Sequence, residues 1–162
     1  WKSGGLHRQS FILWLAVQNR LSTHDRIYKF TPGPLACVLC NGGLETHSHL
    51  FFHCPYTGFL WQDMLNRLGV SCNATDWESI VNWAATKWKG KRPSQTIPRL
   101  CFTNLVYAIW SERNSRTFKG KEKPRTVVQK EVYSLIQAQI LLKWKFDVNK
   151  TLYASKWECP PV

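Results

Sequence analysis

The sequence predicts a mostly α-helical fold, in which a small helical domain tied by one metal site is followed by a basic helical C-terminal region. Apolar residues recur at three- and four-residue steps along most of the chain, few stretches alternate apolar and polar residues as strands do, and cysteines and histidines gather between residues 37 and 54. A chain of 162 residues that is 44% hydrophobic can bury a core. We expect a first domain over 1–95 and a basic region over 96–162 packed on it, or one continuous domain.

The first predicted helix covers residues 8–21. Its apolar stripe is expected to consist of Phe11, Trp14, Leu15 and Leu21, broadened by Ile12 and Val17. Thr23 is expected to cap a short second helix, because its hydroxyl can accept a hydrogen bond from a free backbone N–H group. The Pro- and Gly-containing stretch 31–34 then ends that helix.

Four further helices are predicted. One spans about 56–68 and ends at Gly69, and the next is capped by Asp76 and buries Trp77, Ile80, Val81, Ala84 and Trp88. A long helix with Pro98 in its first turn reaches about residue 117. The last helix is expected to bury Val128, Val132, Leu135, Ile136 and Ile140, and no periodicity follows from about Asp147.

The cysteines and histidines follow the pattern Cys37-x2-Cys40-x8-His49-x4-Cys54. A tight turn between the first two thiolates lets both reach one ion, and the later histidine and cysteine complete a tetrahedron, which is the geometry that zinc prefers. Four protein ligands leave no open position for a reactive water, so the pattern predicts one structural Zn²⁺ ion rather than a catalytic one.

Other assignments of these side chains are open. His47 is the alternative to His49 as the nitrogen ligand, whereas His53 adjoins Cys54 and is expected at the surface or as a hydrogen-bond donor to a ligand. Unligated thiols or disulfides are the competing interpretation of the cluster. The remaining cysteines are expected to take no part, and Cys101 lies on an apolar helical face: Cys72, Cys101 and Cys159.

Positive charge is concentrated in the second half of the chain. The net charge is +12, and residues 87–162 carry sixteen basic and five acidic side chains against six and five in residues 1–86. Such a concentration attracts polyanions, which favours nucleic acid as the partner, although solvated lysines and arginines on helix faces are the alternative explanation.

Two basic segments are the predicted nucleic-acid contacts. The first interleaves cations with Trp88, which also fits the core face of its helix, so that phosphate contacts are assigned to Lys87, Lys89, Lys91 and Arg92. The denser segment, our first choice for a strip that contacts the nucleic-acid backbone, comprises Arg113, Arg116, Lys119, Lys121, Lys123 and Arg125. Lys143-Trp144-Lys145 is a third candidate. No helix-turn-helix or finger-helix signature appears, which favours RNA recognised through shape and backbone.

Several functional classes are not expected. The longest apolar run has seven residues, from Phe11 to Val17, against roughly 20 for a bilayer-spanning helix. No signal-peptide cleavage site follows that run, so we expect an intracellular protein of the nucleus or of an organelle such as the mitochondrion. No paired-aspartate motif or catalytic triad is evident, and we expect neither an enzyme nor a small-molecule substrate. The chain opens with Trp1 rather than Met, which leaves its true N-terminus open.

Several sequence blocks around the cluster resemble the zinc-binding domain at the C-terminal end of plant non-LTR (LINE-type) retrotransposon polyproteins. They are Phe11–Ala16, Arg20–Ile27, Cys37–Cys40, Glu45–Thr46, His49–Cys54 and Trp61, followed by Ile109–Asn114, which is similar to a downstream Trp-x-x-Arg-Asn segment. The resemblance covers roughly residues 5–118. It implies that Cys37, Cys40, His49 and Cys54 bind zinc in a nucleic-acid-contacting module, and it carries over no catalytic residue.

This resemblance and the charge together lead to three functional hypotheses. The first is a retrotransposon-derived, domesticated RNA-binding subunit of a large ribonucleoprotein such as a ribosome, with other proteins as neighbours. The second is the nucleic-acid-engaging C-terminal domain of an active LINE-type polyprotein. The third is a protein-interaction module without nucleic acid.

Overall fold

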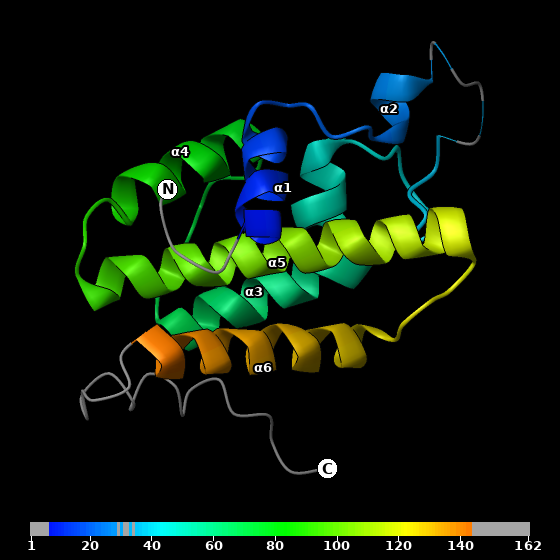
Figure 1. Ribbon diagram of the computed structural model, residues 1–162. Helices are drawn as coiled ribbons and strands as arrows, with labels where there is room; N and C mark the ends of the chain where they lie inside the picture. Colours follow the sequence, from blue (N-terminus) through cyan, green and yellow to red (C-terminus); the bar gives the residue numbers. More distant parts are fainter. Residues whose placement is uncertain (1–6, 29, 31–32, 34, 144–162) are drawn as a thin grey trace.

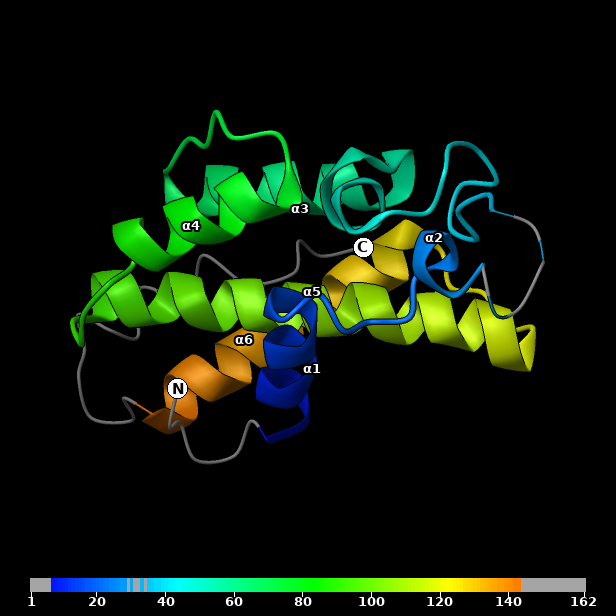
Figure 2. The ribbon, with the colours of Figure 1, turned by 90° about the horizontal axis from the view of Figure 1, so that it is seen from above.

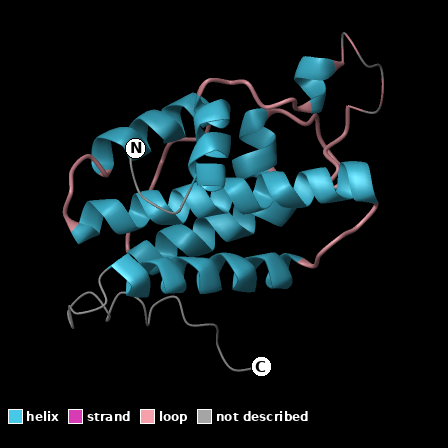
Figure 3. Cartoon of the chain, in the orientation of Figure 1, coloured by secondary structure: helices cyan, strands magenta, loops and turns pink. Residues whose placement is uncertain are grey.

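The computed structural model describes residues 7–28, 30, 33 and 35–143, and its elements in this range are helices (Figure 3). They are α1 (His7–Val17), α2 (His24–Ile27), the π-helical turn η1 (His49–His53), α3 (Pro55–Leu68), α4 (Trp77–Lys87), α5 (Pro93–Lys119) and α6 (Arg125–Lys143). The described residues contain no β-strand, and their single β-bridge pairs Ala36 with Leu44. The mostly α fold predicted from periodicity is therefore confirmed.

The 27-residue helix α5 runs through the middle of the molecule (Figures 1 and 2). It contacts α1, α3, α6 and η1. Helix α1 crosses α5 steeply, whereas α6 folds back along α5 after the connector 120–124 (Figure 1). Because α5 contacts four other elements, its apolar residues are buried on several sides, which explains why α5 organises the core.

One hydrophobic core joins the N-terminal and C-terminal parts of the chain. Its centre is a group of aromatic rings from η1, α3, α4 and α5, with centroid separations from 4.9 to 6.5 Å between neighbouring rings: Phe51, Phe52, Trp61, Trp77, Trp83, Trp88 and Phe102. Trp88 is 2% exposed, so its assignment to the core is confirmed. The domain boundary predicted after residue 95 falls inside the first turn of α5, and the same core contains residues from both sides of it.

The face predicted for the first helix is partly wrong: Ile12 and Leu15 pack against the core as expected, but Phe11, Trp14 and Val17 do not. Helix α1 directs Leu13 and the small Ala16 into the core, whereas Phe11 and Trp14 are about half exposed, at 56% and 47%. The helix also ends at Val17, so that Leu21 is buried from the segment beyond it. Apolar residues surround almost all of this short helix, so their periodicity cannot select a face, and close approach to α5 favours the side with alanine.

Several helix ends agree with the sequence prediction. Gly69 ends α3 in the left-handed conformation, with φ of 66°, which a residue without Cβ adopts freely. The Asp76 side chain caps α4 by accepting a hydrogen bond of 2.9 Å from the Ser79 N–H. Of the stripe predicted on the last helix, all members are buried except Leu135, which is 41% exposed.

Two predicted helix starts differ from the structure. Thr23 occupies the N-cap position of α2, but its hydroxyl makes no capping bond and is buried without a partner. Pro98 lies inside α5, because the helix begins five residues earlier at Pro93, which also suits a first turn. A proline within a helix lacks the N–H that would bond four residues back, and dense packing around α5 offsets that loss.

None of the described helices is both long and apolar enough to cross a bilayer.

Candidate metal centre

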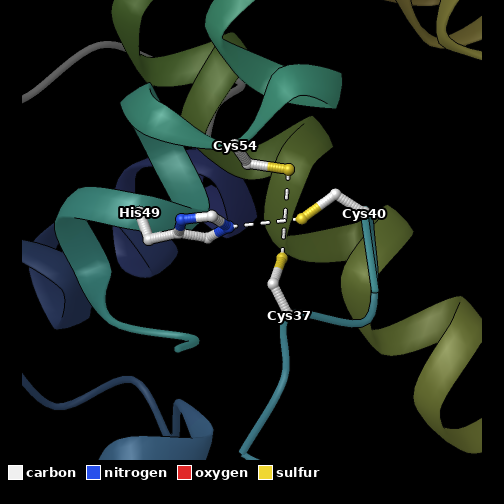
Figure 4. A group of neighbouring side chains, drawn as sticks. All are labelled: Cys37, Cys40, His49 and Cys54. Carbon is white, nitrogen blue, oxygen red and sulfur yellow. Dashed lines mark hydrogen bonds between the residues drawn. The ribbon is translucent and has the colours of Figure 1, made fainter. Parts of the chain in front are cut away.

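Four side chains from two segments converge beside the C-terminal half of α5. Figure 4 shows Cys37, Cys40, His49 and Cys54 pointing toward one another. Their potential ligand atoms all lie within 4.8 Å of each other, and no other such group of histidines, cysteines or acidic residues occurs in the part of the chain that the structure describes. These are the four residues that the spacing predicted.

The geometry of this cluster fits a tetrahedral zinc ion. The Cys37 and Cys54 Sγ atoms are 3.9 Å apart, and the Cys40 Sγ atom is 3.4 Å from His49 Nε2. A tetrahedral ion with Zn–S bonds of about 2.3 Å and Zn–N bonds of about 2.05 Å separates its ligands by roughly 3.8 Å and 3.6 Å. Three thiolates and one imidazole are also the donor set that selects zinc over harder cations.

The first half of the site is a tight loop closed by backbone hydrogen bonds. The Cys37 N–H donates to the Gly43 carbonyl over 3.0 Å, and the Asn41 N–H donates to the Cys37 carbonyl over 2.7 Å. Asn41 has φ of 53°, a left-handed conformation that asparagine tolerates better than most residues. The loop thereby turns both thiols toward the same point.

The second half depends on the π-helical turn η1. The Cys54 N–H donates to the His49 carbonyl over 2.7 Å, which is the five-residue bond that defines a π turn. At 3.6 residues per turn, two residues five apart would differ by about 140° around an α-helix and could not share an ion. The widened turn places His49 and Cys54 on the same side, which explains the x4 spacing between them. The Thr46 hydroxyl accepts a hydrogen bond from the His49 N–H over 3.1 Å and fixes the start of the turn.

Cys54 is prepared to act as a thiolate. It occupies the N-cap position of α3, next to Pro55 and the free N–H groups of the first turn. A hydrogen bond from Cys37 is the main cause that lowers the pKa of Cys54 to about 5, and the N–H groups of Tyr56 and Thr57 add to it. The pKa of Cys37 is raised because that thiol keeps the shared proton. Metal binding replaces this proton.

The other candidate side chains lie apart from the cluster. His47 is buried against Phe51 and Trp77, and its burial lowers the pKa to about 4, so this histidine is neutral and belongs to the core. His53 is exposed, Cys72 is half-buried and Cys101 is fully buried in α5, as expected for a core cysteine. The five described cysteines are free of disulfides; Cys159 lies outside the described residues.

A buried ion pair ties the loop that carries Cys37 and Cys40, residues 35–48 and called the metal loop below, to α5. The Arg113 guanidinium, 2% exposed, donates from Nη2 and Nε to one oxygen of the fully buried Glu45, over 2.8 and 3.2 Å. That oxygen also accepts from the His24 N–H over 3.1 Å, and Arg113 donates to the Ser22 carbonyl over 3.2 Å. Three chain segments thus meet at one pair of charges.

Arg116 makes a second link between α5 and the metal loop. Its guanidinium donates to the Leu39 carbonyl, between the first two cysteines, over 3.3 Å and to the Glu112 carboxylate over 2.8 Å. It also lies over the Tyr56 ring at 4.7 Å from the centroid, and Tyr56 donates to the Lys123 carbonyl over 2.7 Å. Helix α5 and its connector therefore support the site from behind.

These contacts correct part of the predicted nucleic-acid strip. Arg113 lies in the interior, and Arg116 is 10% exposed and ion-paired, so neither belongs to an open surface strip. Each stabilises the metal loop instead. The Glu45–Thr46 and Trp-x-x-Arg-Asn blocks contain one partner each of the Glu45–Arg113 pair, but the sequence carries no signal that pairs residues 68 positions apart.

The remaining predicted cations are exposed and form two separate groups. The first, Lys87, Lys89, Lys91 and Arg92, surrounds the connector between α4 and α5. The second, Lys119, Lys121, Lys123 and Arg125, surrounds the connector between α5 and α6. Lys123 pairs with Glu131 at the surface over 2.6 Å. The side chains of the third candidate, Lys143-Trp144-Lys145, lie outside the part of the chain that the structure describes.

The zinc-binding class that this geometry defines agrees with the comparison with protein families. Residues 1–61 match the family described as zinc-binding in reverse transcriptase. Residues 1–61 are therefore similar to a reverse transcriptase zinc-binding domain, the family that the resemblance predicted. The matched region contains all four cysteine and histidine residues of the site, and it ends before α5. Comparisons with curated proteins and with solved structures find no significant match.

Proposed function

We propose that this chain is a non-catalytic module that uses a structural zinc ion to hold a nucleic-acid-binding surface, with RNA as the favoured ligand. The observation that carries the proposal is the separation of the cations by role. Arg113 and Arg116 beside the metal loop are held in buried ion pairs, whereas the two exposed groups defined above, apart from Lys123 with its Glu131 partner, remain available to phosphates.

The placement of the two groups suits an extended polyanion. They lie at opposite ends of α5, and 27 residues at 1.5 Å each place the ends of this helix about 40 Å apart. A ligand that contacts both groups must span that length. No described element presents the base-reaching side chains of a recognition helix, which favours contacts with the backbone and with the shape of RNA.

The proposal includes a non-enzymatic role, because the site as built has four protein ligands and no open coordination position. A domesticated subunit of a large ribonucleoprotein, such as a ribosome, is the setting that the basic charge supports best. The C-terminal domain of an active LINE-type polyprotein is the second candidate, and the family match supports it equally. An upstream polymerase reading frame in the same transcript would decide for the second.

Salt dependence of RNA affinity tests the proposal. Fluorescence anisotropy with a labelled RNA hairpin, measured at KCl concentrations on either side of the physiological value, is expected to give a steep linear decrease of log affinity with log salt. Replacing Lys119, Lys121, Lys123 and Arg125 with glutamine is expected to reduce the slope by roughly 0.7 to 0.9 for each phosphate that is no longer neutralised. The same change in the Lys87–Arg92 group reports on the other end of α5.

Arg26→Gln provides the matched control, because Arg26 is exposed on α2 and belongs to neither group. Its slope should equal that of the unmodified protein, and circular dichroism should show that every variant folds. A salt-independent affinity, or equal slopes in all variants, would contradict RNA binding by these groups. Partners that stay bound after nuclease treatment would instead support a protein-interaction module.

A further inference from the structure

A mostly apolar groove of about 320 Å³ lies between α1 and α4, above α5. Its walls and floor include Trp14, Val17, Val81, Trp88, Arg99 and Phe102. Helices α1 and α4 lie on the same side of α5 in Figure 1. This volume is in the lower part of the range of roughly 300–1,000 Å³ that small-molecule pockets occupy. The groove can therefore admit a planar ring system without movement of the helices.

Trp14, which lines the groove on α1, is open to solvent and has Phe11 beside it, outside the lining. Phe11 and Trp14 stack on each other with ring centroids 6.0 Å apart and an angle of 23° between the planes. Both are about half exposed, and the Arg20 guanidinium lies 5.5 Å from the centre of the Trp14 ring. Exposed aromatic rings combined with arginine form the platforms on which proteins stack unpaired bases.

The other end of the groove meets the first cationic group. Trp88, in the floor, directly precedes the connector that contains Lys89, Lys91 and Arg92, and these three side chains are exposed. Arg99 fixes this junction by donating to the Trp88 carbonyl over 2.6 Å. None of the described residues that line the groove is acidic. An apolar slot flanked by cations is complementary to a ligand that joins flat apolar rings to phosphates.

We propose that this groove binds an unpaired base of a single-stranded nucleic acid, with the adjacent phosphates held by the Lys87–Arg92 group. The inference rests on the proposed nucleic-acid-binding function. It specifies that the nucleic acid is single-stranded where it contacts the Lys87–Arg92 group, at one end of α5. A base within a duplex is stacked on both faces, so a duplex can reach the cations but not the groove. A single strand can use both, because its bases turn out of the stack at low cost.

The test removes the exposed aromatic pair and measures the change in affinity for single-stranded and for double-stranded RNA. The probe is a fluorescein-labelled oligouridine of about ten nucleotides, within the site sizes that single-strand-binding folds cover, and the competitor is a blunt RNA duplex of the same length. The double substitution Phe11→Ala with Trp14→Ala is expected to weaken oligouridine binding on the order of tenfold, because base stacking contributes about 1–3 kcal/mol per base. Duplex affinity should stay within about twofold, since its phosphate contacts remain.

Phe118→Ala is the matched control. Phe118 is 75% exposed beside the second cationic group, at Lys119, and is not part of the groove lining. Its oligouridine affinity is expected to equal that of the unmodified protein. Because all three aromatic side chains are substantially exposed, the variants should melt at the same temperature as the parent, which circular dichroism checks.

The outcomes separate this inference from the broader function. If the unmodified protein binds neither probe, the proposed function fails. Suppose that the unmodified protein binds both probes with steep salt dependence. If the Phe11/Trp14 variant then keeps its affinity for both probes, or loses affinity for both equally, the groove inference is overturned while the function stands. If that variant instead abolishes self-association in sedimentation and retains oligouridine affinity, the groove is a protein interface. A photo-crosslink from 4-thiouridine to an α1 or α4 peptide supports base binding.

Discussion

The metal loop, residues 35–48, and the helical bundle formed by η1 and α3 to α6 obtain their order from different interactions. The loop has one β-bridge, and its position depends on the potential ligands Cys37 and Cys40 and on the Glu45–Arg113 ion pair to α5. The bundle is held by apolar packing, with aromatic rings and aliphatic residues such as Ile136 and Ile140 fully buried. Removal of one ligand should therefore disorder the loop first, whereas apolar packing should keep the bundle helical.

The polar contacts between the two regions come mainly from side chains of α5, so the loop depends on the bundle more than the bundle depends on the loop. Arg113 and Arg116 project from α5 and donate to the Glu45 carboxylate and the Leu39 carbonyl of the loop, and the loop makes one contact in return, since the Ser48 hydroxyl accepts a hydrogen bond of 2.9 Å from the Trp77 N–H at the start of α4. The bundle thus provides a scaffold on which a short segment can position its ligands before the metal arrives. Three experiments test whether the loop depends on the bundle in this way.

Loss of the metal is expected to have the largest effect. Cys40→Ser, or treatment with a strong chelator, should abolish stoichiometric zinc binding and the hydrogen-exchange protection of residues 35–48, since structural zinc contributes on the order of 10 kcal/mol in small modules. Helical circular dichroism from α5 and α6 should be largely retained. Plasma emission measures the zinc content, and hydrogen exchange followed by mass spectrometry measures the protection of the loop.

Cys72→Ser is the control for this experiment, because Cys72 is half-buried and outside the cluster. It should bind one equivalent of zinc and keep the protection of the loop. A Cys40→Ser protein that still binds one equivalent and melts normally would show that the cluster is not the zinc site.

Arg113→Ala is expected to cost about 3–5 kcal/mol of unfolding free energy, because it leaves the fully buried Glu45 carboxylate without its charged partner. Lys119→Ala on the same helix removes an exposed cation and should change stability by less than about 0.5 kcal/mol. Urea denaturation measures both. The double variant Glu45→Gln with Arg113→Met should lose less than the sum of the single changes, since neither charge is then buried alone.

A loss smaller than about 1 kcal/mol for Arg113→Ala would mean that water enters and solvates Glu45. In that case the metal loop would be independent of α5. The comparison between the two regions would then describe two separately stabilised parts rather than a scaffold and its dependent loop.

The smallest effect is expected at the cap of α4, within the bundle. The Ser79 backbone N–H donates to Asp76 and holds the pKa of that carboxyl below its usual value of 3.8. Because the folded-state pKa is the lower one, the cap contributes fully above pH 3.8 and its contribution is lost as pH falls through the folded-state pKa. Thermal melts at several pH values should show Asp76→Ala destabilised at neutral pH.

Asp76→Asn separates the charge from the hydrogen bond, because asparagine also caps helices well. Its melting temperature should approach that of the parent as the pH falls below 3.8. A constant difference between the two proteins from neutral pH down to that acidic range would contradict a role for the ionised carboxyl.

The four cysteine and histidine residues could be assigned from the sequence because ligand chemistry and short spacing are local properties. The end of α3 and the start of α4 were also predictable, since Gly69 and Asp76 act within one turn of their helices. The buried face of α1 was not, because apolar residues surround most of that helix and its partner determines which side is covered. The role of Arg113 was missed for the same reason, since a cation and its partner 68 positions away become neighbours only in the folded chain.

The helical class, the cluster of four cysteine and histidine residues and the surplus of positive charge could be predicted before folding is considered, because each follows from residue type and spacing along the chain. Tertiary structure alone decided which cations remain at the surface and which stabilise the metal loop, and it formed the groove between α1 and α4. Burial and pairing depend on residues that are distant in the chain, so the positions of the exposed cations are known only once folding has placed every arginine and lysine.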